Sequence, residues 1–352
     1  MTSSSGSTWT VEWFGTTTFR ARGSGLDLFF DGYLDRLPGL DPVGLTTAEV
    51  GRADFVFVSH AHFDHLCGVA PIARSTGAMV VASPESARVL RQDGIPENQI
   101  LMVTGGETVR CGPGVSVSVL PALHSCLAAA SEFDSAVECL GDLGVSAQDQ
   151  WRAIQSAFAG GFSSAPAPVA RAMKDMLDHS SAHHGGQLAY LLRTADGAAL
   201  FSGSSGYWPG IFAGLRPDVA FLALAGRPNV SGEPYQGSSA RFMLEQAEVL
   251  RPERVCFCHH DPLIPGLPGT DVTGAAALLQ ERKPGSYFTL GYATPRPLFS
   301  LGGPGRPTDA TVTTARTAVM NAGADHVGNS QTSASRSLIA TATRMMASPS
   351  RR

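Results

Sequence analysis

The sequence predicts an α/β fold with a large hydrophobic core, and three observations support this. Hydrophobic residues make up 43% of the 352-residue chain, a content that suits an ordinary globular core. Short runs rich in β-branched and aromatic residues open the chain and are separated by glycine turns. Further on, apolar strands are followed by segments with helical spacing and helix-capping residues.

The opening of the chain is expected to form antiparallel strands followed by a buried strand and a helix. The opening strands cover residues 8–15, 17–23 and 26–32. Residues 54–60, DFVFVSH, form a short and almost wholly apolar strand. A helix is predicted over residues 83–94. Ser83 supplies its N-cap, Pro84 takes its first position and Gly94 lies past its end.

The middle of the chain contains one further strand and then a long segment of different composition. Residues 115–124 alternate valine with serine, so one face of this strand is expected to be buried. Residues 125–182 are rich in alanine and are interpreted as a helical insertion. The helical spacing is found at residues 132–143, 147–158 and 168–179.

Strands and helices alternate again in the last part of the predicted domain. An ADG turn joins the two apolar runs of residues 187–206 as a hairpin. Strands are then expected at 218–226, 254–261 and 286–292, and helices at 239–250 and 272–282. From Gly302 onward there is no aromatic residue, and Gly, Ser, Thr and Ala dominate. We therefore expect one domain over residues 1–301 and a disordered or loosely helical tail over residues 302–352.

The charge of the chain favours a small-molecule partner. The formal net charge is −4, the pI is near 6.2, and there is no run of lysine or arginine that would attract nucleic acid or an anionic membrane. The first residues contain no basic segment followed by an apolar one, and no apolar stretch is long enough to span a membrane. We expect a soluble, cytoplasmic protein, and a homo-oligomer remains open.

The six cysteines are spaced too irregularly for a disulfide framework, because no C-x-x-C pair is present. Most are expected to be reduced and buried as small hydrophobic residues. Cys256 and Cys258 alternate with Phe257 on an expected strand and therefore share one face. Packing is favoured over metal binding for this pair.

The most informative motif is HAHFDH, which directly follows the apolar strand at residues 54–60. The chain has 10 histidines in all, yet His60, His62 and His65 fall within six positions and Asp64 lies between them. These side chains cannot share one helical face, but a loop leaving a buried strand can direct them to a common point. The motif therefore predicts a metal site.

The chain resembles the metallo-β-lactamase-fold hydrolases, whose H-x-H-x-D-H signature matches HAHFDH. The resemblance extends from about Trp9 to Phe299 and includes the segments WFGTTTF and FFDGYL, the histidine after VLPAL and a histidine after a late strand. It implies an αββα sandwich in which two central sheets are covered by helices. Loops at the strand ends would hold one or two metals at one edge, and the 125–182 insertion would lie over that edge as a lid.

The resemblance also implies which residues bind metal. The first metal would be held by His60, His62 and His124, and the second by Asp64, His65 and a histidine of CFCHHD. Two histidines compete for the last role. Strand alternation places His260 on the face of the two cysteines, although a turn beginning there would reverse this. Similarity to related sequences aligns His259 with the ligand, and we favour His259.

The chain departs from the family pattern at Gly203 and Ser204. Most members carry Gly-Asp there, and the aspartate bridges both metals; here no acidic residue lies between Leu200 and Arg216. Two divalent cations close together repel each other, so the loss of a carboxylate is expected to weaken the second site. The family also includes a branch that looks similar, with G-S-x-G at this point, so Ser204 is interpreted as a feature of that branch.

The implied three-histidine site has an open fourth position, which is the arrangement of a catalytic zinc. Water bound there would ionise near neutral pH and attack a carbonyl or phosphoryl centre. Asp64 would be either a ligand of the second metal or the base that orients this water, and both roles stay open. Iron or manganese would also suit such a site.

Further residues are expected near the pocket. His183 and His184 lie just before the strand that leads to Ser204 and are possible substrate donors or replacement ligands, whereas His179 is expected to end the insertion as a polar residue. Tyr207 and Trp208 follow the Gly-Ser turn and are possible pocket residues. The insertion contributes aromatic residues that are expected to pack mainly with one another, namely Phe133, Trp151, Phe158 and Phe162.

Three functions are compatible with these residues. The first is a zinc-dependent hydrolase of a small organic ester, lactone or amide, ahead of a phosphodiester. The second is an iron-dependent oxidoreductase on the same fold, because histidine suits iron as well as zinc. The third is a non-catalytic metal- or ligand-binding protein with a degenerate second site, which the retention of all the histidines disfavours.

Overall fold

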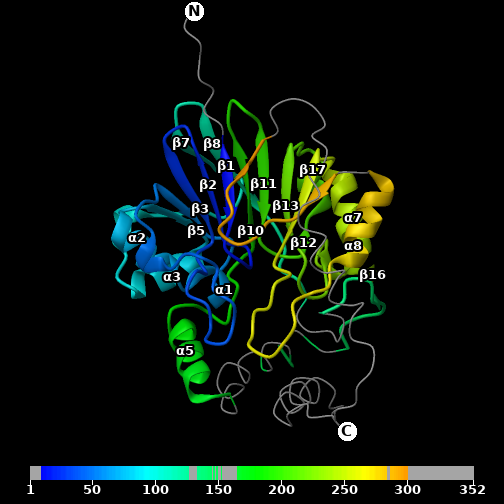
Figure 1. Ribbon diagram of the computed structural model, residues 1–352, viewed down its shortest axis with the longest axis horizontal. Helices are drawn as coiled ribbons and strands as arrows, with labels where there is room; N and C mark the ends of the chain where they lie inside the picture. Colours follow the sequence, from blue (N-terminus) through cyan, green and yellow to red (C-terminus); the bar gives the residue numbers. More distant parts are fainter. Residues whose placement is uncertain are drawn as a thin grey trace, which may run out of the picture.

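The structure is a computed structural model of the chain, and two seven-stranded sheets form its centre (Figure 1). The strand orders are β19-β1-β2-β3-β4-β5-β6 in the first sheet and β18-β17-β13-β11-β10-β8-β7 in the second. The structure describes residues 9–126, 133–144, 146, 148–149, 152, 165–283 and 286–299.

The first sheet combines an antiparallel start with a parallel continuation. β1, β2 and β3 pair antiparallel, as predicted, whereas β3, β4, β5 and β6 pair parallel. Its strands are β1 (Thr10–Trp13), β2 (Phe19–Gly23), β3 (Leu26–Phe30), β4 (Phe55–Phe57), β5 (Met79–Ala82), β6 (Ile100–Met102) and β19 (Arg296–Pro297). β5 and β6 were not predicted from the sequence.

The second sheet contains the predicted hairpin at its centre. β10 and β11 pair antiparallel across the ADG turn, and β11, β13 and β17 pair parallel. Its strands are β7 (Thr108–Gly112), β8 (Val115–Pro121), β10 (Leu188–Arg193), β11 (Ala198–Ser202), β13 (Val219–Ala223), β17 (Arg254–Cys258) and β18 (Tyr287–Phe288). Two smaller sheets comprise β12 (Gly206–Tyr207) with β14 (Asn229–Val230) and β15 (Glu233–Pro234), and β9 (Glu138–Cys139) with β16 (Gly237–Ser238).

Helices cover the outer faces of both sheets, as Figure 1 shows, with α2 and α3 on one side and α7 and α8 on the other. Apolar side chains of these helices pack into an outer core on each side, while Phe30 of the first sheet stacks on Phe201 of the second in the inner core. The architecture is therefore an αββα sandwich. The helices are α1 (Phe63–Leu66), α2 (Val69–Thr76), α3 (Pro84–Gln92), α5 (Ala167–Asp178), α6 (Pro209–Phe212), α7 (Ser239–Leu250) and α8 (Thr273–Arg282), with short 3-10 helices at Thr47–Glu49 and Glu97–Gln99.

Two local predictions are confirmed in detail. The Ser83 side chain accepts a hydrogen bond from the backbone N–H of Ser86, so α3 is capped as its sequence indicates. Cys256 and Cys258 both lie in the inner core between the sheets, where they are free thiols. Burial raises the pKa of both thiols, which keeps them protonated and inert. Packing is thus the role of this pair.

The helix predicted over residues 132–143 is wrong. Asp134 instead forms a turn by accepting a hydrogen bond from the N–H of Ala136, and β9 follows and pairs with β16. Gly141 has a φ of 81°, which a helix does not allow. The helix predicted over 168–179 is confirmed as α5. Most of 147–158, the aromatic residues Trp151, Phe158 and Phe162, and the tail 302–352 lie outside the described residues.

The direction of the strands brings six chain segments to one edge of the sandwich. β1, β3 and β4 run the same way in the first sheet, and β8, β11 and β17 run the same way in the second. The loops that follow these strands contain the histidine motif and most other predicted site residues. Within the described ranges, no helix has the length and apolarity needed to cross a membrane.

Candidate metal centre

Three histidines from two loops form the first group at this edge. The candidate ligand atoms of His60, His62 and His124 all lie within 4.8 Å of one another. His60 and His62 come from the loop after β4, and their Nε2 and Nδ1 atoms are 3.1 Å apart. His124 follows β8, and its ring centroid lies 4.8 Å from that of His60 and 4.7 Å from that of His62.

A hydrogen bond of His124 determines which of its two ring nitrogens carries no proton. Its Nδ1 lies 2.8 Å from the backbone carbonyl oxygen of Ser125. Because a carbonyl can only accept, Nδ1 carries the proton and Nε2 presents its lone pair to the group. A backbone carbonyl behind a histidine is the usual way to orient a metal ligand.

Burial keeps the three histidines neutral. The side chain of His60 is completely buried, and burial together with the neighbouring histidines lowers its pKa well below the usual value. Burial lowers the pKa of His62 to about 4 and that of His124 well below its usual range. At neutral pH these rings offer lone pairs without a positive charge, which is the state that a metal ligand needs.

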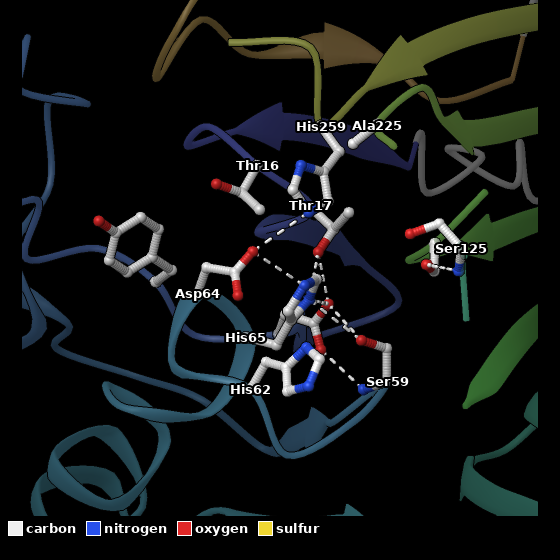
Figure 2. Close-up of polar contacts among 12 residues, drawn as sticks. Thr16, Thr17, Ser59, His62, Asp64, His65, Ser125, Ala225 and His259 are labelled. Carbon is white, nitrogen blue, oxygen red and sulfur yellow. Dashed lines mark hydrogen bonds and ion pairs between the residues drawn. The ribbon is translucent and has the colours of Figure 1, made fainter. Parts of the chain in front are cut away.

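The second group contains a carboxylate. The candidate ligand atoms of Asp64, His65 and His259 lie within 4.8 Å of one another. Asp64 Oδ2 is 3.2 Å from His65 Nε2 and 3.1 Å from His259 Nε2 (Figure 2). Asp64 and His65 belong to α1, which starts directly after His62, and His259 follows β17.

Asp31 lies behind the second group and was missed as a functional residue in the sequence. It is 2% exposed and directly follows β3, and its Oδ2 is 2.8 Å from His65 Nδ1. Asp31 also accepts hydrogen bonds from the Thr17 hydroxyl at 2.6 Å and from the N–H and hydroxyl of Ser59 at 2.7 and 2.9 Å. A carboxylate at Nδ1 leaves Nε2 to face the centre of the group. Its position after a buried strand, as with the histidine motif, was the signal that could have found it.

The charges of the second group are strongly coupled. Burial opposes ionisation of Asp64, but the adjacent His65 and His259 outweigh this and hold its pKa well below the usual value. Burial also disfavours the charged form of His65, yet Asp64 and Asp31 together raise its pKa to about 10. Without a metal, this group is therefore an ion-pair network in which His65 carries the positive charge.

The backbone places His259, and not His260, beside Asp64. His259 has a φ of 57°, so the strand alternation ends there, and its N–H donates to the Thr16 carbonyl at 2.8 Å. This turn directs His259 toward Asp64. His260 instead stacks on Trp13 with ring centroids 5.2 Å apart, and its Nδ1 has no hydrogen-bond partner in the part of the chain that is described.

A second carboxylate fixes the loop that carries His259. Asp261 accepts hydrogen bonds from the N–H of Thr16 and from Arg36, both at 2.8 Å, and from the hydroxyl of Tyr292 at 2.9 Å. Thr16 is thus tied to this loop through both its N–H and its carbonyl oxygen. The two loops form one unit that holds the histidine in place.

Ser204 contacts the loop that carries His124. It is buried, and its hydroxyl oxygen accepts a hydrogen bond from the N–H of Ser125 at 3.0 Å. The serine therefore anchors the loop that begins at His124. A Cβ at the preceding Gly203 would lie 2.8 Å from the side chain of Ser59, so only glycine fits between the two loops.

The other predicted pocket residues are distributed unevenly. The His184 ring stacks on His124 with centroids 5.3 Å apart, and His183, next to it, is exposed. His179 lies apart from the centre and bonds Asp93 at 2.7 Å. Trp208 is 38% exposed and remains available to a ligand.

Tyr207 is a correction, because it is not a pocket residue. It is only 4% exposed, and its ring packs against Phe212 and Phe242 in the outer core beneath α6 and α7. The short strand β12 turns the side chain inward, so proximity in sequence to the Gly-Ser turn was misleading.

The donors present fit a transition metal. Together the two groups offer five imidazoles and one carboxylate, in loops that follow buried strands and in α1. Imidazole suits zinc, copper, iron and nickel, whereas magnesium and calcium prefer oxygen ligands. The neutral histidines and the backing groups Asp31 and Ser125 are the features expected around such an ion.

Comparison with known proteins supports this interpretation. A family model described as "Beta-lactamase superfamily domain" matches residues 26–141, which include the histidine motif. In the search of solved structures, a metallo hydrolase of the archaeon Ignicoccus hospitalis aligns over 82% of this chain and 97% of its own, with a TM-score of 0.54 and 17% identity. The alignment over most of both chains shows that this chain and the metallo hydrolase share a fold.

Other similar proteins align over a shorter segment or over only part of their own length. A "UPF0173 metal-dependent hydrolase" of Pyrobaculum calidifontis is 33% identical over 115 residues, which cover 33% of this chain and 50% of the relative. The chain thus spans about half the length of such relatives. The diiron beta-hydroxylase CmlA of Streptomyces venezuelae aligns over 84% of this chain and 54% of its own, with a TM-score of 0.50 and 18% identity, which shows a shared fold.

Proposed function

We propose that the protein is a metal-dependent hydrolase of a small organic ester, lactone or amide, with zinc as its metal. The observation that carries this proposal is the convergence of six side chains from three chain segments into two groups, each with its candidate ligand atoms within 4.8 Å of one another. The relatives named metal-dependent hydrolases support it. Their matched segment includes the histidine motif but covers only half of their length.

The chain would use its residues as follows. His60, His62 and His124 would hold one zinc, and Asp64, His65 and His259 a second, which the missing bridging carboxylate would make weaker. Zinc supplies Lewis acidity and activates water near neutral pH. Asp64 would serve as a ligand or as the base that orients the attacking water. Asp31 keeps the Nδ1 proton of His65 in place, so that His65 Nε2 faces the centre.

A small neutral or weakly charged substrate fits the composition of the chain. The net charge of −4 gives no general attraction to a polyanion, which places esters, lactones and amides ahead of phosphodiesters. Trp208 is the exposed aromatic residue beside the loop of Ser204 and is a suitable contact for the organic part of such a substrate.

A second candidate is an iron-dependent oxidoreductase. It is favoured by the shared fold with the diiron beta-hydroxylase and by the imidazole-rich donor set, which suits iron as well as zinc. It differs from the first proposal in the metal that the purified protein contains and in its need for an oxidant. Manganese in the same centre would support hydrolysis.

The test combines metal analysis with activity. Tag-free protein would be analysed by plasma mass spectrometry and assayed on aryl esters, lactones, anilides and bis-aryl phosphates, before and after removal of metal by a chelator. Zinc in the protein, with hydrolysis that the chelator abolishes and zinc restores, is the expected result. Iron would favour the oxidoreductase. Bound metal without turnover of any substrate would indicate a binding protein and contradict the hydrolase.

A further inference from the structure

The segment before β10 runs directly beside the histidine motif. The N–H of Ala61, which lies between His60 and His62, donates to the carbonyl oxygen of His184 at 3.0 Å. The carbonyl oxygen of Ala61 accepts from the N–H of Ser181 at 2.8 Å. The backbone on which two candidate ligands are mounted is therefore paired with the backbone that carries His184.

The other side of this segment is held by α3. The Ser181 hydroxyl donates to the Glu85 carboxylate at 2.6 Å, and a Cβ added to Gly185 would lie 2.1 Å from the Cβ of Glu85. Gly185 and Gly186 have φ values of 71° and 94°, which favour glycine. His184 is thus positioned by a tight turn that packs between α3 and the histidine motif.

The ring of His184 lies beside the first group without joining it. Its centroid is 5.3 Å from that of His124 with an angle of 17° between the planes, and 6.3 Å from that of His62 with an angle of 90°. His60 is completely buried, whereas His184 is exposed. An exposed histidine ring therefore lies directly against the ring of His124 in the first group.

One hydrogen bond determines which ring nitrogen of His184 can donate. The N–H of Gly186 donates to His184 Nδ1 at 3.1 Å, so this nitrogen uses its lone pair as an acceptor. In the neutral ring the proton then lies on Nε2. A nitrogen that carries a proton is not a metal ligand, and His184 is absent from the set of atoms that gather within 4.8 Å in the described part of the centre.

We propose that His184 contacts the substrate, donating a hydrogen bond from Nε2 to an oxygen of the reacting carbonyl or phosphoryl group bound at the first histidine group. The inference rests on the proposed hydrolase function. A neutral donor fixed beside the reacting centre stabilises negative charge that develops on this oxygen, and such donors commonly contribute about 10²–10³ in kcat. The structure assigns this role to His184 because its ring stacks on that of His124, a member of the group.

The first test compares three variants by activity and zinc content. His184→Phe keeps a ring without a donor, and we expect kcat/KM for the best substrate to fall by about 10²-fold with the zinc content unchanged. His184→Gln keeps an N–H donor and should recover a large part of the loss. His179→Phe is the matched control, since His179 is in the same segment but bonds Asp93, and its kcat/KM should equal that of the wild type.

A second readout is independent of turnover. Cobalt-substituted protein would be titrated with acetate, whose binding at an open coordination position alters the visible spectrum. Acetate should bind about 10-fold more weakly to His184→Phe than to wild type, and His184→Gln should lie between them. If the wild type hydrolyses nothing, the proposed function fails while this titration still decides the role of His184. Unchanged acetate binding and kcat/KM in His184→Phe, or loss of metal from it, would overturn the inference.

Discussion

The two groups of side chains at the sheet edge hold their histidines by different means. His60, His62 and His124 are kept neutral by burial, and their nearest fixed partners are a backbone carbonyl and a serine hydroxyl. The second group instead contains Asp64 and is backed by the buried carboxylate of Asp31. One chain segment thus supplies ligands to a neutral group and to a charged group.

This difference teaches what each group requires from the fold. The neutral group needs exclusion of water and correct tautomers, because its rings must present lone pairs without protons. The charged group needs its carboxylates to be paired, because an unpaired buried charge is strongly destabilising. The groups should therefore respond differently to mutation and oppositely to pH, and the following experiments test that contrast in order of expected effect.

Replacing Asp31 should have the largest effect on stability. Asp31→Ala leaves His65 Nδ1 and the N–H of Ser59 without their acceptor and removes one partner of a buried charged pair, at a cost of about 3–5 kcal/mol in the free energy of unfolding. Urea denaturation of chelator-treated protein measures it. Asp196→Ala, in the exposed turn between β10 and β11, is the control. Equal unfolding midpoints for both variants would refute the assigned role of Asp31.

The stability of the metal-free protein should fall on both sides of an optimum near pH 6.5. The pKa of His62 is lowered to about 4 in the folded protein, so the unfolded chain takes up the proton first and stability falls between about pH 6.5 and 4. The pKa of His65 is raised to about 10, so its contribution is fully present below about pH 6.5 and is lost as the pH rises toward 10.

Two variants distinguish the loss of stability at acidic pH from the loss at alkaline pH. His62→Asn should reduce the loss of stability between about pH 6.5 and 4, to which His60 and His124 also contribute, and His65→Asn should reduce the loss above about pH 6.5, each by an amount on the order of a few kcal/mol. The measurement is the free energy of unfolding in urea from pH 4 to 10 with a chelator present. If both variants altered the free energy of unfolding only on the same side of pH 6.5, the contrast between a neutral and a charged group would be wrong.

Loss of the Ser204 hydroxyl should have an intermediate effect. Ser204→Ala leaves the N–H of Ser125 without its acceptor, at a cost of about 1–3 kcal/mol in the free energy of unfolding, and loosens the loop of His124. Ser202→Ala is a matched control, since the Ser202 hydroxyl is buried at the end of β11, two residues before Ser204, and has no hydrogen-bond partner among the residues described. Thermal unfolding of both would show an effect for Ser204 alone, and equal shifts would contradict it.

The smallest effect is expected for His179. This exposed side chain bonds Asp93 outside the centre, so His179→Ala should change the free energy of unfolding by only about 0–1 kcal/mol. Its zinc content and pH profile of stability should match those of the wild type. A loss of zinc would show that the centre extends further into this segment than the two groups indicate.

Much of this architecture could be predicted from the sequence, since its signals are local. The apolar run before His60, the caps of α3 and the turn between β10 and β11 each depend on a few adjacent residues. The histidine motif combines rare residues at a specific spacing, and it therefore predicted a metal site at one edge of the domain. The helix expected over residues 132–143 failed because β9 is stabilised by pairing with β16, which lies far along the chain.

The details of the centre depended on backbone geometry and long-range contacts. His259 rather than His260 faces Asp64 because of a left-handed residue at the end of β17, which strand alternation does not reveal. Asp31 is a single aspartate whose partners come from two loops and from α1, and Tyr207 is turned into the core by β12. The sequence shows these residues but not the long-range contacts that determine their roles.

The most direct test of the central account is zinc uptake by two paired variants, His62→Ala and His259→Ala. Each would be stripped of metal and titrated with zinc beside the wild type and His179→Ala, with bound metal measured by plasma mass spectrometry. The account predicts that each of the first two loses the uptake of its own group and keeps that of the other, and that His179→Ala binds as the wild type does. Wild-type uptake by both His62→Ala and His259→Ala would contradict it.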